Sequence, residues 1–139
     1  LVSLTDVFAT CAAINGVKFP QDAGEDSFDL TGTLKGDVRN SPVRPYLLQQ
    51  TFAMKLSIRK GNWKYIDHKG SGGNNYEKPG EWGMKQYALP DTDPDAPGQL
   101  YNLARDPGET TNLYSKNPEK VAELKGLLEK SKASGRTAD

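Results

Sequence analysis

The sequence has one cysteine, Cys11, and one histidine, His68, among its 139 residues. A single cysteine excludes an internal disulfide and a cysteine-built zinc site. Basic and acidic residues balance at 18 each, and no apolar run approaches the roughly 20 residues that cross a bilayer. We therefore expect neither nucleic acid nor a membrane as a partner.

The residues that are present describe a polar chain rich in loops. Hydrophobic residues make up 35% of it, and it holds 14 glycines and 9 prolines. This composition predicts one domain with a modest core. The chain opens at Leu1 without a signal peptide, and its first residues have the pattern of a folded interior, so we expect an excised fragment.

A short helix is predicted over residues 4–15. Ser3 and Asp6 have the spacing of a capping box, in which the Ser3 hydroxyl accepts from the Asp6 backbone and the Asp6 carboxylate reaches back. Gly16 suits a left-handed C-terminal position. One face is apolar, and nothing close in the sequence covers it: Leu4, Val7, Phe8, Cys11 and Ala12. On that face Cys11 is expected to be a buried hydrophobe rather than a nucleophile.

Alternating residues predict an antiparallel sheet after an irregular stretch at 17–42. Residues 44–51 are extended, residues 56–66 form a hairpin that turns at Gly61, and residues 99–103 form another strand. A final helix follows, capped by Asn117, started by Pro118 and stopped by Gly135, with an apolar stripe of Val121, Leu124, Leu127 and Leu128. The predicted fold is α+β, with three to four antiparallel strands covered by the C-terminal helix and the N-terminal helix set apart.

Chemistry-bearing residues are few. The long loop 67–97 holds His68 and the run Gly70-Ser71-Gly72-Gly73, whose backbone N–H groups could cradle an anion, although a solvated histidine and a flexible loop are the blander alternatives. Asp91, Asp93 and Asp95 alternate as calcium ligands do, but the spacing departs from a calcium loop, so we expect no metal site in this chain. The aromatic residues Trp63, Tyr65 and Tyr101 are expected in the core or on a sheet face rather than on a stacking platform.

Several segments, in order, resemble the end of the sulfatase family, which is of the arylsulfatase type and belongs to the alkaline-phosphatase superfamily. The most specific match runs from Gln99 to Leu113, and the others are residues 1–11, 25–36 and 58–66. The resemblance implies that residues 1–40 are the tail of a catalytic α/β domain and that residues 41–139 are the C-terminal subdomain packed on it. The helix at 4–15 would then lie in the catalytic domain, which would explain its uncovered face.

The resemblance also implies the activity and the missing parts. Sulfatases hydrolyse sulfate esters with a formylglycine made in a Cys/Ser-x-Pro/Ala-x-Arg motif, beside a calcium ion. Cys11 is followed by Ala12-Ala13-Ile14-Asn15, so it lacks the motif's arginine. We therefore expect the formylglycine and the calcium in the missing catalytic domain, no catalytic residue in this chain, and no activity of the chain alone.

The substrate-binding residues expected in this chain are His68 and Trp82 in the long loop, together with Gln49 and Gln50. Related sequences often carry histidine in the strand after an Arg-Pro pair, here Arg44-Pro45, where this chain has glutamines. This departure predicts a different substrate preference. The expected partners are the chain's own catalytic domain and a sulfated substrate, and the expected location is periplasmic or secreted.

Two alternatives stay open. One is a stand-alone carbohydrate- or protein-binding module that uses Trp63, Trp82 and the loop tyrosines as contacts. The other is the same part of a phosphodiesterase or phosphonate hydrolase of the superfamily, which the upstream nucleophile would separate from a sulfatase.

Overall fold

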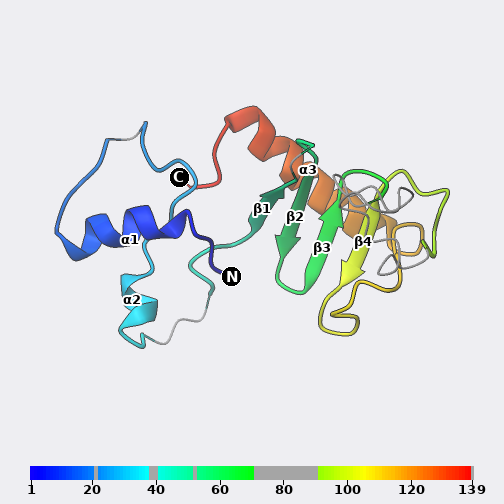
Figure 1. Ribbon diagram of the computed structural model, residues 1–139, viewed down its shortest axis with the longest axis horizontal. Helices are drawn as coiled ribbons and strands as arrows, with labels where there is room; N and C mark the ends of the chain where they lie inside the picture. Colours follow the sequence, from blue (N-terminus) through cyan, green and yellow to red (C-terminus); the bar gives the residue numbers. More distant parts are fainter. Residues whose placement is uncertain (21, 38–40, 52, 71–90, 139) are drawn as a thin grey trace, which may run out of the picture. The chain divides into compact units, whose positions relative to one another are not determined.

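The computed structural model describes residues 1–20, 22–37, 41–51, 53–70 and 91–138. The chain divides into two compact units, one of residues 1–47 with 129–139 and one of residues 48–128. The first unit contains helices α1 (Asp6–Ile14) and α2 (Thr31–Leu34), and the second contains most of a four-stranded sheet (Figure 1). The domain boundary expected at residue 40 stays a prediction. No helix among the described residues is both long and apolar enough to span a membrane.

The predicted sheet is confirmed, with the strand order β1-β2-β3-β4. Its strands are β1 (Leu47–Gln50), β2 (Leu56–Lys60), β3 (Trp63–Ile66) and β4 (Gln99–Asn102). The hairpin of β2 and β3 turns at Gly61, whose φ of 57° is one that glycine adopts without strain.

Cross-strand pairing arranges side chains of the sheet in two neighbouring rows. Ile58, Tyr65 and Leu100 pair side by side in one row and are buried. Lys60, Trp63 and Asn102 pair in the next row of the same face, nearer the hairpin turn. Successive residues of a strand point to opposite faces, so both rows share one face.

Helix α3 (Pro118–Ser134) covers that face of the sheet, as predicted. Val121, Leu124 and Leu128 recur at helical spacing and are buried, which completes the core with the first row of the sheet. Gly135 follows the helix with a φ of 69°, so the expected stop is confirmed.

The ends of α1 match the prediction only in part. The Asp6 carboxylate accepts from the Ser3 backbone N–H at 2.7 Å, as a capping box requires. The prediction of the reciprocal hydrogen bond is wrong, because the Asp6 N–H donates to the Ser3 carbonyl and not to the Ser3 hydroxyl. At the other end, Gly16 and Val17 donate back into the last turn at 3.1 and 2.9 Å, with Gly16 at a φ of 64°.

Helix α1 presents its faces in the opposite sense to an ordinary surface helix. The buried side of the helix consists of Asp6, Ala9 and Thr10, two of which are polar. The predicted apolar face is exposed at Val7 (55%) and Phe8 (52%) and at Leu4 (91%), which lies just before the helix; Ile14 (66%), not part of the prediction, is exposed too. The prediction that Cys11 is buried is therefore wrong for this chain, because Cys11 shares the exposed face.

One further departure concerns the irregular stretch at 17–42. It contains the short helix α2, which the sequence analysis did not predict. The Asp29 carboxylate accepts from the Thr31 backbone at 2.8 Å and so supplies a local start signal.

Gly98 makes a closer approach than any larger residue allows. A Cβ there would lie 2.7 Å from the Ile66 carbonyl oxygen. We expect Gly98→Ala to lower the free energy of unfolding by about 1–3 kcal/mol, as overpacking does. Gly126→Ala is the matched control, because nothing lies within 4 Å of its added Cβ, and it should raise stability by up to about 1 kcal/mol as a helix-interior substitution. Equal effects of the two variants in a urea titration would contradict this reading.

Candidate functional site

The described members of the predicted substrate-binding set, Gln49, Gln50 and His68, lie at the same end of the strands without forming a joined site. Gln49 and Gln50 are exposed at the end of β1, and His68 lies two residues beyond β3. Strand β2 separates β1 from β3. The Gln99 amide donates to the His68 carbonyl at 3.0 Å and so ties the backbone of His68 to β4. Trp82 and residues 71–73 lie outside the described residues, and the substrate-binding role of the whole set stays a prediction.

The alternating aspartates hold loops together. The Asp93 carboxylate accepts from the Ser115 backbone at 3.0 Å, and Asp91 accepts from the Asp93 backbone at 3.0 Å. The hydrogen bonds from Ser115 hold the pKa of Asp93 below its usual value of 3.8. Among the residues that the structure describes, no three His, Cys, Asp or Glu side chains gather as metal ligands would.

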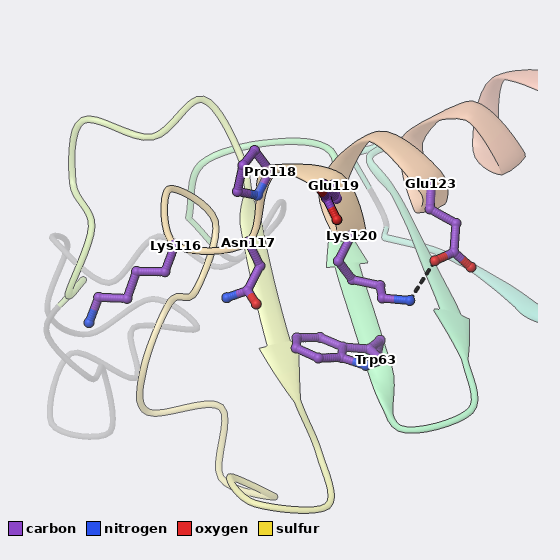
Figure 2. Close-up of a pocket in the computed structure, with 7 residues that line it drawn as sticks. All are labelled: Trp63, Lys116, Asn117, Pro118, Glu119, Lys120 and Glu123. Carbon is purple, nitrogen blue, oxygen red and sulfur yellow. Dashed lines mark hydrogen bonds and ion pairs between the residues drawn. The ribbon is translucent and has the colours of Figure 1, made fainter.

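Trp63 lies at the centre of a surface site among the described residues. Tyr65 and Tyr101 are buried, but Trp63 is only partly covered because it stands in the row nearest the hairpin turn, where α3 begins. It lines one hollow of about 420 Å³ together with Lys116, Asn117 and Lys120 (Figure 2).

A second hollow, of about 440 Å³, adjoins Trp63. Asn102, Arg105 and Asn117 contribute to its walls. We call the two hollows together the Trp63 groove. The residues that define it are Trp63, Asn102, Arg105, Lys116, Asn117 and Lys120.

Ion pairs fix part of the Trp63 groove. Glu123 accepts from Lys120 at 2.5 Å and from Lys60 at 2.8 Å. The Lys120 bond, followed by the Lys60 bond, lowers the pKa of Glu123 to about 2, so this carboxylate stays charged. The Lys120 ammonium also stands 5.9 Å from the centre of the Trp63 ring, within range of a cation–π contact.

A second polar cluster, in the other compact unit, was missed by sequence reasoning. Arg44 and Asp6 form a bidentate ion pair, and their side chains are 2% and 0% exposed. The Arg44 guanidinium also donates to the Asp26 carbonyl at 2.6 Å and stacks 4.6 Å from the Phe28 ring. Burial alone would raise the pKa of Asp6, but the bonds from Arg44, Ser3 and Phe28 outweigh it and hold that pKa below 3.8. This cluster joins α1 to residues 26–28 and 44 and has a structural role.

Comparison with known proteins decides the family. No family model matches the chain. The chain is 36% identical over 132 residues to N-acetylgalactosamine-6-O-sulfatase of Bacteroides thetaiotaomicron, and the matched residues are 95% of the chain and 24% of that protein. It is 33% identical over 132 residues to arylsulfatase K of Xenopus laevis, which covers 89% of the chain and 21% of that protein. The chain is a C-terminal sulfatase region.

Solved structures agree with this assignment. A structure from work on the metabolism of multiple glycosaminoglycans by Bacteroides thetaiotaomicron matches 92% of the sulfatase region, with a TM-score of 0.69 and 34% identity, over 24% of its own chain. A 2-O GAG sulfatase shares the fold, with a TM-score of 0.58 at 19% identity over 90% of the region and 23% of that chain. The region thus spans about a quarter of the length of the relatives that it matches.

Proposed function

We propose that this sulfatase region is part of an enzyme that hydrolyses sulfate esters on sugars, and that the region alone is inactive. The similarity to two sulfatases over 95% and 89% of the chain carries the proposal. The first of these relatives is named for N-acetylgalactosamine 6-O-sulfate, which makes that sugar the first substrate to test. The sulfatase names of both relatives favour a sulfate ester over the phosphodiester alternative. A periplasmic or secreted location belongs to the same proposal.

The catalytic groups of the proposed enzyme belong outside this chain. A formylglycine nucleophile and a calcium ion would supply the attack on the ester and the neutralisation of the sulfate charge. The described residues do not fit such a centre, since they gather no metal-ligand cluster, and Cys11 lacks the required sequence context. We therefore derive no catalytic step from this region and assign it a supporting role.

The exposed face of α1 supports a specific partner, the catalytic domain of the same protein. Four large apolar side chains share this face, and each is more than half exposed. An exposed apolar patch of this kind marks an interaction surface. Because the region spans about a quarter of its relatives' length, the rest of the same polypeptide is the proposed cover.

Activity provides the direct test. We expect the full-length protein to release sulfate from N-acetylgalactosamine 6-sulfate in the presence of calcium, and residues 1–139 alone to release none above a buffer blank. The full-length protein is the positive control for the assay. Turnover that copurifies with the isolated region would overturn its inactivity, and a full-length protein that cleaves phosphodiesters but not sulfate esters would overturn the proposed reaction.

A further inference from the structure

The Trp63 groove has the composition of a sugar-binding surface. A sugar ring has an apolar C–H face and polar edges, so it suits a partly exposed aromatic face flanked by amides. Trp63 supplies the face, and Asn102 and Asn117 supply the amides. One polar atom of each amide is already engaged, because the Asn102 oxygen accepts from the Ala104 N–H at 3.2 Å and the Asn117 nitrogen donates to the Leu113 carbonyl at 3.3 Å. This assignment departs from the expectation that Trp63 lies in the core or on a sheet face, and it gives Trp63 the carbohydrate contact that the binding-module alternative named.

The charges around the Trp63 groove balance in number, with the carboxylates Asp106, Glu119 and Glu123 and the cations Arg105, Lys116 and Lys120 on its walls. Its carboxylates are largely engaged: Glu123 accepts from two lysines, and Asp106 accepts from the Thr110 and Thr111 backbones at 3.0 and 2.9 Å. Glu119 also lines the first hollow. Of the three cations, Lys120 is already paired with Glu123, so Arg105 and Lys116 are the two that we consider for a ligand.

Arg105 and Lys116 are the cations proposed to contact a ligand, and Lys116 also lies close enough to Asp93 to help lower the pKa of that carboxyl. Within the described part of the chain, neither forms an ion pair. They line different hollows, each of which is also lined by Trp63 and Asn117, and Figure 2 shows the Lys116 side chain extending away from Trp63. Because the two cations line two different hollows, they match a ligand that carries more than one negative charge better than they match a single small anion.

We propose that the Trp63 groove binds a sulfated oligosaccharide, with one sugar stacked on Trp63 and sulfate groups against Arg105 and Lys116. The choice of a sulfated sugar rests on the proposed function. The groove would hold a glycan chain apart from the catalytic groups, which this region does not contain.

Binding to the 139-residue chain tests the proposal. The probe is a size-defined oligosaccharide carrying 6-sulfated N-acetylgalactosamine, titrated calorimetrically beside its desulfated counterpart. We expect the sulfated probe to bind at least about tenfold more tightly, and Arg105→Ala with Lys116→Ala to remove about tenfold of that affinity, as lost charge-assisted hydrogen bonds do. Trp63→Phe, which keeps a smaller ring, should weaken binding by about threefold, because part of the stacking area is lost.

Lys125→Ala is the matched control, because Lys125 is an exposed lysine of α3 that does not line the groove. It should leave the affinity unchanged. Equal binding of the sulfated and desulfated probes, an unaffected double variant, or equal binding of an acidic peptide would overturn the proposal. The assay involves no catalysis, so it fails independently of the proposed function: a full-length protein without sulfatase activity would refute the reaction while leaving a selective groove standing.

Discussion

Replacing Arg44 with methionine is expected to lower the free energy of unfolding by about 3–5 kcal/mol, the usual cost of removing one partner of a buried ion pair. The reason is the state in which Asp6 is left. Its side chain is 0% exposed, and without Arg44 its remaining partners are the Ser3 and Phe28 backbone N–H groups. A buried carboxylate with incomplete compensation destabilises the folded state strongly. Urea denaturation at neutral pH measures the loss.

The pH dependence separates this explanation from simple loss of packing. In the native chain the pKa of Asp6 lies below 3.8, so its contribution to stability is present above that value and is lost as the pH falls through the lowered pKa. In Arg44→Met the bonds and charge of Arg44 are lost while burial, the largest influence on Asp6, remains, so we expect the pKa of Asp6 to rise and the variant to gain stability as acidification neutralises Asp6. The difference between the two proteins should therefore shrink towards low pH. A difference that stays constant with pH would show that lost packing alone is responsible.

A matched exposed pair provides the control. Lys60 and Glu123 are 48% and 39% exposed, so Lys60→Met should cost less than about 1 kcal/mol. The double variant Asp6→Asn with Arg44→Met should recover part of the loss, because no buried charge remains. Failure of this recovery would point to the Arg44 bond to the Asp26 carbonyl instead.

The fold was largely predictable because its signals are local. Alternation at residues 56–66, glycine at position 61 and the stripe on the last helix all act over a few residues, and the structure has each element. The Arg44–Asp6 pair was not predictable, since 38 residues separate its members and nothing in the spacing marks them as partners. The prediction that Cys11 is buried was wrong for a related reason. Periodicity shows which face of a helix is apolar, but it does not show whether this chain contains the residues that cover that face.

The candidate site followed the sequence less closely. Loop position and family resemblance predicted His68, Gln49 and Gln50 as substrate-binding residues. The structure places them at one end of the strands, without contacts between them that would test this role. The Trp63 groove arises from register, because pairing with Lys60 and Asn102 places Trp63 one row beyond the core. Residue type alone favours the core for a tryptophan, so its partial exposure becomes visible only after the strands are aligned.

Leu4→Ala should have little effect in the 139-residue chain and a large one in the full-length protein. Leu4 is 91% exposed in this chain, so its truncation should stay within about 0.5 kcal/mol, as for other surface substitutions. If the catalytic domain covers the face of α1, the same change creates a cavity and should cost about 2–5 kcal/mol.

The contrast between the two proteins is the measurement, because it cancels any intrinsic effect of the substitution on the helix. Ile14→Ala, at the other end of the exposed face, should show the same contrast, and Lys125→Ala should show none. Thermal denaturation of both proteins with each variant gives six comparisons on one scale. Small effects of both apolar truncations in the full-length protein would mean that the face is not covered by the rest of the polypeptide, and the proposed packing of this region on a catalytic domain through α1 would be wrong.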